Sequence, residues 1–176
     1  MPIYPFLEYL PKYDHTVYIS PSADLIGWSM LGQDSSLWFN VTVRGDVNYI
    51  KIGARTNIQD GSVVHVTTLT NPTIIGDDVT VGHGAILHGC TIGDLCLIGM
   101  GAIVMDGAVI EPKSYIAAGA LVPPGKVVPT GTLFVGSPGQ VKRDLTQAEL
   151  DFFPVSASNY VALKNLYLQQ DSKTKS

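Results

Sequence analysis

Residues 73–110 read TIIGDDVTVGHGAILHGCTIGDLCLIGMGAIVMDGAVI, and an aliphatic residue recurs there about every six positions. A period of six fits neither an amphipathic helix, which needs about 3.6 residues, nor a free strand, which needs two. Glycines such as Gly76 and Gly82 supply turn conformations that a Cβ would resist. A six-residue repeat of this kind is typical of a parallel β-helix.

The same repeat extends through most of the chain. Three hexads would form one triangular coil whose aliphatic residues fill the axis, and coils would stack about 4.8 Å apart. The fifth position of each hexad is small or thin, as at Val47, Thr91 and Cys96. The aliphatic positions are Ile19, Leu25, Leu31, Leu37, Val43, Ile52, Ile58, Val64, Ile75, Val81, Leu87, Ile92, Ile98, Val104, Ile110, Ile116, Val122 and Val128. We therefore expect an all-β solenoid over residues 17–130, with a protruding loop at 67–72.

Two segments flank the expected solenoid. Residues 1–16 are punctuated by prolines and should form a lead-in that packs on the first coil. Residues 131–176 should form a linker followed by C-terminal helices, because prolines and glycines mark the exit from the solenoid.

The C-terminal segment carries clear helix signals. Thr146 and Glu149 form a capping-box pattern that opens a helix. Pro154 should break this helix, and a second one should begin at Ser156–Ser158 and end near Gln169. We expect that helix to lie along the prism through one apolar side, which comprises Tyr160, Val161, Leu163, Lys164 and Tyr167.

Composition restricts the class of protein. The chain has 176 residues, of which 45% are hydrophobic and 15% charged, as expected for one domain with a well-buried core. A net charge of -4 argues against nucleic acid or an anionic membrane as a partner. With neither an apolar stretch of about 20 residues nor a basic signal peptide, a cytoplasmic location is expected. Cys90 and Cys96 form no CxxC pair, so we expect them to be buried rather than redox-active or zinc-binding.

Counting hexads places three histidines on two faces of the prism. If Val64 lies on face A, His65 and His88 both follow a face A residue and should stack outward on adjacent coils, close enough to share a metal ion. His83 follows Val81 on face C, around a corner. Three prisms around a threefold axis could bring all three histidines together if face A of one subunit abuts face C of the next. Three neutral imidazoles with open coordination positions would form a catalytic rather than a structural metal site.

Polar residues accompany the histidines on both faces. Arg44 and Asp46 should lie one coil below the face A histidines, and Gln59 and Asp60 one coil below the face C histidine. Across an A-to-C contact, Arg44 would meet an acidic or amide-bearing surface. Simpler interpretations remain open, because Arg44 and Asp46 could form a corner salt bridge and Asp60 could hydrogen-bond its own backbone at a turn.

Three stretches of the chain resemble a known family: SLWFNVTVRGDVNYIKIG, TNIQDGSVVHV and TVGHGAILHGCTIGDLCLIGMGAIVMDGAV. With RGD, NIQD-x4-H and GH-x4-H in order, the chain is similar to the gamma-class carbonic anhydrases, which form a left-handed parallel β-helix with a C-terminal helix. The resemblance implies a homotrimer with interfacial metal sites that hold zinc, iron or cobalt. His65 and His88 of one chain and His83 of its neighbour would be the ligands.

The resemblance also implies the reaction and the roles of further residues. The reaction would be reversible hydration of carbon dioxide to bicarbonate by a metal-bound hydroxide, formed because the metal lowers the pKa of water toward about 7. Gln59 would orient the hydroxide. Arg44, Asp46 and Asp60 would make interface and substrate-side contacts, and Tyr160 would approach the pocket from the helix.

The sequence departs from the best-characterised members of that family at the residues that export protons. Those members carry a glutamate directly after RGD, where this chain has Val47, and an acidic residue in the loop after the first ligand histidine, where this chain reads TTLTNPT. Slow proton export is therefore expected.

Two other classes of function fit the same fold. An acyl-CoA transferase would use His83 or His88 as a general base, and a thioesterase would use the same metal site on an acyl-thioester. A non-catalytic metal-binding trimer is the third possibility. We expect a gamma-type carbonic anhydrase, with carbon dioxide and bicarbonate as small-molecule substrates.

Overall fold

The computed structural model describes the backbone of residues 3–174 and the side chains up to residue 170, so residues 1–2 and 175–176 of the two flanking segments lie outside it. The elements are β1 (Ile3–Tyr4), β2 (Lys12–Tyr13), β3 (Tyr18–Ile19), β4 (Asp24–Leu31), β5 (Ser36–Leu37), β6 (Thr42–Ile52), β7 (Asn57–Ile58), β8 (Val63–His65), β9 (Thr73–Ile75), β10 (Thr80–Val81), β11 (Ile86–His88), β12 (Thr91–Ile92), β13 (Leu97–Ile98), β14 (Ile103–Val104), β15 (Val109–Ile110), β16 (Tyr115–Ile116), β17 (Leu121–Val122), β18 (Val127–Val128), β19 (Thr132–Gly136), β20 (Gly139–Asp144) and α1 (Gln147–Thr174).

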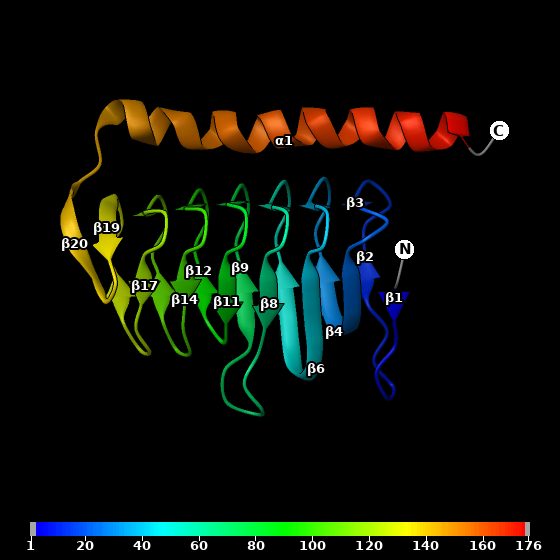
Figure 1. The fold of residues 1–176 in the computed structure, drawn as a ribbon, viewed down its shortest axis with the longest axis horizontal. Coiled ribbons are helices and arrows are strands. Elements are labelled where there is room, and N and C mark those ends of the chain that lie inside the picture. Colours follow the sequence, from blue (N-terminus) through cyan, green and yellow to red (C-terminus); the bar gives the residue numbers. More distant parts are fainter. Residues whose placement is uncertain (1–2, 175–176) are drawn as a thin grey trace.

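The strands form the predicted parallel solenoid, which Figure 1 shows from the side. Each short strand pairs with the strand one coil away, so β8 pairs with β11 and β11 with β14. Another face carries β7, β10 and β13 in the same way. The long strand β6 turns a corner, because its first residues pair with β8 and its last with β9. The register therefore follows the hexads: Val64 lies opposite Leu87, and Ile58 opposite Val81.

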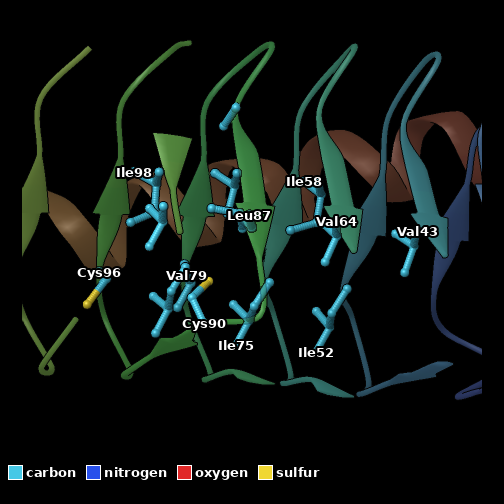
Figure 2. Packing of buried hydrophobic residues seen from close by; sticks show 14 of the residues in the cluster. Val43, Ile52, Ile58, Val64, Ile75, Val79, Leu87, Cys90, Cys96 and Ile98 are labelled. Carbon is cyan, nitrogen blue, oxygen red and sulfur yellow. The ribbon is translucent and has the colours of Figure 1, made fainter. Parts of the chain in front are cut away.

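The aliphatic positions fill the axis of the coils, as Figure 2 shows for the central part of the solenoid. Val64, Leu87 and Ile58 are completely buried. Two of the residues at small positions are not buried. Thr91 is exposed and Cys90 occupies the buried position instead, because the preceding coil is one residue shorter. Val47 is 40% exposed because it lies in the outer part of β6.

Both cysteines are buried free thiols, as predicted. Burial raises the pKa of Cys90 and of Cys96 to about 12, so neither forms a thiolate near neutral pH. The structure gives them a packing role.

Strands close both ends of the solenoid. At the start, β1 and β2 pair in parallel with β4. At the other end the solenoid continues past residue 130, because β19 adds a rung on β16 and Phe134 is fully buried there. The chain then reverses, and β20 pairs antiparallel with β19. Phe134 still follows the six-residue step from Val128, but the repeat did not predict β20, whose residues no longer follow the hexad.

Among the described residues, one helix, α1, covers one side of the prism and runs back along its length toward the first coils (Figure 1). The capping box at its start is confirmed, because the Thr146 amide donates to Glu149 and the Glu149 amide donates to Thr146 Oγ1. The prediction that Pro154 breaks the helix was wrong. Phe153 and Ala157 are buried against the prism on either side of the proline, and this packing outweighs one lost hydrogen bond.

Two further features bear on the surface. The loop between β8 and β9 protrudes as predicted (Figure 1), and Leu69 at its tip is 89% exposed. Among the described residues, no helix combines the length and apolar character needed to span a membrane.

Candidate metal centre

His65 and His88 stack on one face of the solenoid, as hexad counting predicted. Each is the last residue of its strand, β8 or β11, and the two lie opposite one another in the parallel register. Both side chains point outward because Val64 and Leu87, one residue before, point to the axis. The ring centroids are 5.1 Å apart, and His65 Nδ1 lies 3.1 Å from His88 Nε2.

The outer nitrogen of each ring contacts a carboxylate. His65 Nε2 lies 3.0 Å from Asp46 Oδ1. His88 Nδ1 lies 3.1 Å and 3.2 Å from the two carboxylate oxygens of Asp106. Because an ionised carboxylate can only accept, both outer nitrogens must donate their hydrogen, and this fixes the tautomer of each neutral ring.

These hydrogen bonds leave the two inner nitrogens as facing lone pairs. A neutral imidazole has only one N–H, so His65 Nδ1 and His88 Nε2 are both acceptors. Two lone pairs at 3.1 Å repel one another unless a cation lies between them. Two imidazole ligands of one tetrahedral zinc ion would be about 3.3 Å apart, given Zn–N distances of about 2.0–2.1 Å. The pair therefore fits two ligands of a divalent metal ion.

His83 lies on another face, at the end of β10, where Asp60 from the coil below reaches it. His83 Nδ1 is 3.0 Å from Asp60 Oδ2, and both side chains are nearly half exposed. Within the part of one chain that the structure describes, no three histidine, cysteine or acidic side chains gather into a group that could hold a metal. The structure thus brings two of the three predicted ligands together and separates the third, as the face count predicted.

Arg44 and Asp46 form an ion pair beside the histidines, so the simpler interpretation of these two residues is correct within one chain. Asp46 also contacts His65. Burial raises the pKa of Asp46, but the hydrogen bonds from His65 and Arg44 outweigh it and hold the pKa below its ordinary value. The carboxylate is therefore ionised at neutral pH and can keep the tautomer of His65.

Gln59 is buried and belongs to a chain of polar side chains that reaches α1. Its Nε2 lies 3.1 Å from Asn57 Oδ1, and Asn57 Nδ2 lies 3.1 Å from Thr80 Oγ1. Thr80 Oγ1 is 2.9 Å from Ser156 Oγ on the helix. Asn57 Nδ2 also faces the carbonyl oxygen of Val79, which can only accept, so the orientation of both amides is fixed.

Tyr160 lies on the side of His83 rather than of the histidine pair. Its ring packs edge-on against Trp38, with 5.5 Å between ring centroids. Burial raises the pKa of Tyr160, and the charge of Asp60 raises it further. A phenol with a raised pKa stays protonated and can donate a hydrogen bond at the His83 surface. A cavity of about 210 Å³ lies on this surface, lined in part by Gln59 and His83.

Two structural residues near the pair were not found from the sequence. Asp106, between β14 and β15, accepts the hydrogen of His88, and Thr67 in the protruding loop donates its hydroxyl hydrogen to Asp106. In the register of β11 and β14, Leu87 lies opposite Val104, so a count of one coil from His88 leads to Met105 and not to Asp106.

An aliphatic ladder runs beside the histidine pair on the same face. Val63, Ile86 and Ile103 lie opposite one another on β8, β11 and β14, and they are 39%, 40% and 36% exposed. Val63 and Ile86 point outward like His65 and His88 two positions later, and Ile103 continues the row on the next coil. Adjacent exposed aliphatic side chains of this kind are typical of a surface that another protein covers.

A second cavity lies on the other side of Asp46. Its volume is about 210 Å³, and its lining includes Val47 from β6 and Leu69 from the protruding loop. Two aromatic rings complete it: Tyr9 and Trp28 stack in parallel with 4.7 Å between centroids. Asp46 and Asn48 also line this cavity, so its lining combines apolar and polar side chains.

Comparison with known proteins identifies the same six-residue repeat and several similar proteins. The family model for bacterial transferase hexapeptide (six repeats) matches residues 72–104 and 89–124. The chain is 43% identical over 169 residues to gamma carbonic anhydrase 2, mitochondrial, of Arabidopsis thaliana, covering 93% of this chain but 61% of that protein's length. It is 46% identical over 176 residues to protein YrdA of Escherichia coli, covering 97% and 96% of the two chains. It is 45% identical over 147 residues to a probable carbonic anhydrase of Methanocaldococcus jannaschii, covering 84% and 92%.

Solved structures with the same architecture carry transferase names. A putative acetyltransferase of Bacillus cereus superposes with a TM-score of 0.92 at 41% identity, covering 94% of this chain and 95% of that one. A hexapeptide transferase family protein of Anaplasma phagocytophilum gives 0.91 at 42% identity, covering 94% and 98%.

Proposed function

Because the chain belongs to the gamma carbonic anhydrase family, we propose that it hydrates carbon dioxide reversibly to bicarbonate at a metal site shared between subunits. The observation that carries this proposal is the pair of facing lone pairs on His65 and His88, 3.1 Å apart, with each outer nitrogen held by a carboxylate. Imidazole ligands suit zinc, iron and cobalt, so the donor set is compatible with each of them. When bound, such an ion would lower the pKa of water toward about 7 and so make hydroxide available at neutral pH.

The third ligand would be His83 of a neighbouring subunit. One chain contributes the histidine pair on one face and His83 with Asp60 on another, so each interface would join unlike faces. Head-to-tail contacts of this kind close into a ring when the rotation fits, and a ring of three would contain three equal sites. The exposed ladder of Val63, Ile86 and Ile103 supports this arrangement, because the neighbour would cover it beside the metal.

The remaining residues would bind and orient the reactants. Gln59 has its amide fixed by Asn57, which leaves the amide oxygen as an acceptor for the hydrogen of the attacking water oxygen. Arg44 is 44% exposed beside Asp46, where its guanidinium can bind bicarbonate or reach the neighbouring subunit. Tyr160 can donate a hydrogen bond from the His83 side.

The first test is carbon dioxide hydration by stopped flow on protein purified without oxygen, together with metal analysis and light scattering for the mass. We expect about one metal ion per chain, trimeric mass and rapid hydration. The variant His83→Ala should lose both metal and rate. His15→Ala is the matched control, because the His15 side chain is 91% exposed and lies beside Asp14, away from the histidine pair. Bound metal without hydration would rule out the reaction, and unchanged metal in His83→Ala would rule out the shared site.

A separate variant tests the interface. Ile86→Glu puts a charge into the exposed ladder and should reduce the assembly to monomers, with loss of metal. Thr91→Glu introduces the same charge at an exposed position on another face and should leave the mass unchanged. If Ile86→Glu stays trimeric, the ladder does not lie in the interface.

One observation favours a second candidate, hydrolysis of a small acyl-thioester. The cavity lined by Tyr9, Trp28, Val47 and Leu69, together with Asp46 and Asn48, is partly apolar and far larger than carbon dioxide needs. Such a cavity suits the acyl group of a thioester whose carbonyl carbon reaches the metal site. A metal-dependent thioesterase rate that Trp28→Ala reduces mainly through KM would support this candidate over hydration.

A further inference from the structure

Asp106 has a role at the histidine pair that neither its sequence position nor the family resemblance assigns. It lies one coil beyond His88, and both of its carboxylate oxygens approach His88 Nδ1, at 3.1 Å and 3.2 Å. The side chain crosses Gly89 to reach the ring, and a Cβ on Gly89 would lie 2.5 Å from Asp106 Oδ1. The close approach therefore requires glycine at this position.

Thr67 completes the arrangement from the protruding loop. Its hydroxyl donates to Asp106 Oδ1, and its carbonyl accepts a hydrogen bond from Asn48 Nδ2. The Asp106 carboxylate is thus held between the loop and the ring of His88. Its side chain is 31% exposed, so it is partly shielded from water and can act on the ring.

We propose that Asp106 is a positioning residue that keeps the single hydrogen of His88 on Nδ1 and so leaves Nε2 free to bind the metal. Without the carboxylate, His88 could carry its hydrogen on Nε2 and donate it to His65 Nδ1, and in that form it cannot be a ligand through Nε2. Outer carboxylates of this kind change metal affinity by about 10- to 100-fold when removed. The inference rests on the proposed metal site, in which His88 binds through Nε2.

A simpler role for Asp106 would be to hold the loop through Thr67. The two roles predict different results for two variants. Asp106→Asn keeps the shape of the side chain, but its amide can donate to His88 Nδ1 and so permits the other tautomer. Thr67→Val removes only the hydroxyl and leaves the carboxylate on His88.

The experiment measures the tautomer of His88 in metal-free protein by ¹⁵N NMR at about pH 8, above the ordinary histidine pKa of about 6.5, and zinc affinity by competition with a chelator. In the wild type we expect hydrogen on His88 Nδ1. Asp106→Asn should shift the population toward Nε2–H and weaken zinc binding 10- to 100-fold. Thr67→Val should keep the wild-type tautomer of His88, and its zinc affinity should fall less than threefold. Asp94→Asn is the matched control, since Asp94 is an exposed corner carboxylate that accepts a hydrogen bond from the Asp77 backbone amide and does not contact His88.

Three outcomes would overturn the proposal. The first is a wild-type His88 with its hydrogen on Nε2, a result that needs no variant to fold. The second is Asp106→Asn with the wild-type tautomer and affinity. The third is equal loss of affinity in Thr67→Val and Asp106→Asn, which would assign the effect to the loop. If the wild type binds no divalent metal, the proposed function fails, but the tautomer measurement still decides the role of Asp106.

Discussion

Removing the counterion of Lys164 should destabilise the docking of α1, whereas removing the lysine charge itself should not. Lys164 belongs to the helix side that the sequence identified as apolar. Although its side chain is charged, it is only 1% exposed. Its Nζ lies 2.8 Å from Asp34 Oδ1 in the corner after β4 and 2.7 Å from Asn165 Oδ1. The ion pair thus joins the far end of the helix to one of the first coils.

The expected loss of folding free energy in Asp34→Asn follows from the burial of Lys164 and Asp34. Removing one member of a fully buried pair costs about 3–5 kcal/mol, because the other charge stays buried without compensation. The Asp34 side chain is 33% exposed, so water reaches part of the site and we expect about 2 kcal/mol for Asp34→Asn. For a chain of this length that corresponds to a Tm lower by about 4–8 °C. Backbone strain should add little to this destabilisation, since Asp34 has a φ of 57° and asparagine tolerates that region.

Lys164→Met tests the other half of the argument. It replaces a buried charge by an apolar chain of similar length, and such replacements are often neutral or stabilising. We expect a Tm within about 4 °C of the wild type, or above it. The assay is thermal unfolding by circular dichroism at one fixed protein concentration, because assembly contributes to Tm by mass action. If Lys164→Met loses as much as Asp34→Asn, the pair itself stabilises the fold and the reasoning is refuted.

Three further predictions concern the site. Ser156→Ala removes the last hydroxyl of the chain that orients Gln59, and should lower the hydration rate at saturating carbon dioxide while costing only about 1 kcal/mol in denaturant unfolding; an unchanged rate would exclude the helix from the site. The lowered pKa values of Asp46 and Asp106 mean that each carboxylate stabilises the fold above the ordinary value of 3.8 and loses this contribution as pH falls further. Acid titration should therefore show loss of stability below about pH 4, and a smaller loss there in variants with asparagine at either position. Val47→Glu should raise the hydration rate in weak buffer by supplying a proton acceptor, and imidazole buffer should do the same for the wild type; a rate independent of buffer in both proteins would show that proton export is not limiting.

The solenoid and the histidine faces could be predicted from the sequence because both depend on a repeat. Inward and outward positions alternate within each hexad, so the buried Val64 and Leu87 determine that His65 and His88 point outward. Counting also separated His83 from them. The exchange of Thr91 for Cys90 shows the limit of counting, since a coil shortened by one residue moves the small position.

Other parts of the site depend on contacts that no period encodes. Asp106 reaches His88 by crossing a glycine in the coil below, and Ser156 reaches Thr80 only because α1 lies along the prism. Helix signals predicted a break at Pro154, yet burial of Phe153 and Ala157 keeps the helix continuous. In each case tertiary packing decided what local sequence left open.

The hairpin at the end of the solenoid has a consequence for polymerisation. A stack of parallel rungs exposes unpaired backbone groups at its last rung, and a second copy could add there and repeat the process into a fibre. On the face that contains β16, the chain instead reverses after β19, and β20 pairs antiparallel with it. β20 is an exposed edge strand that carries Lys142, Arg143 and Asp144. Axial growth through this face would require a second copy of the chain to pair with an antiparallel, charged strand. The hairpin therefore opposes filament growth through this face of the solenoid.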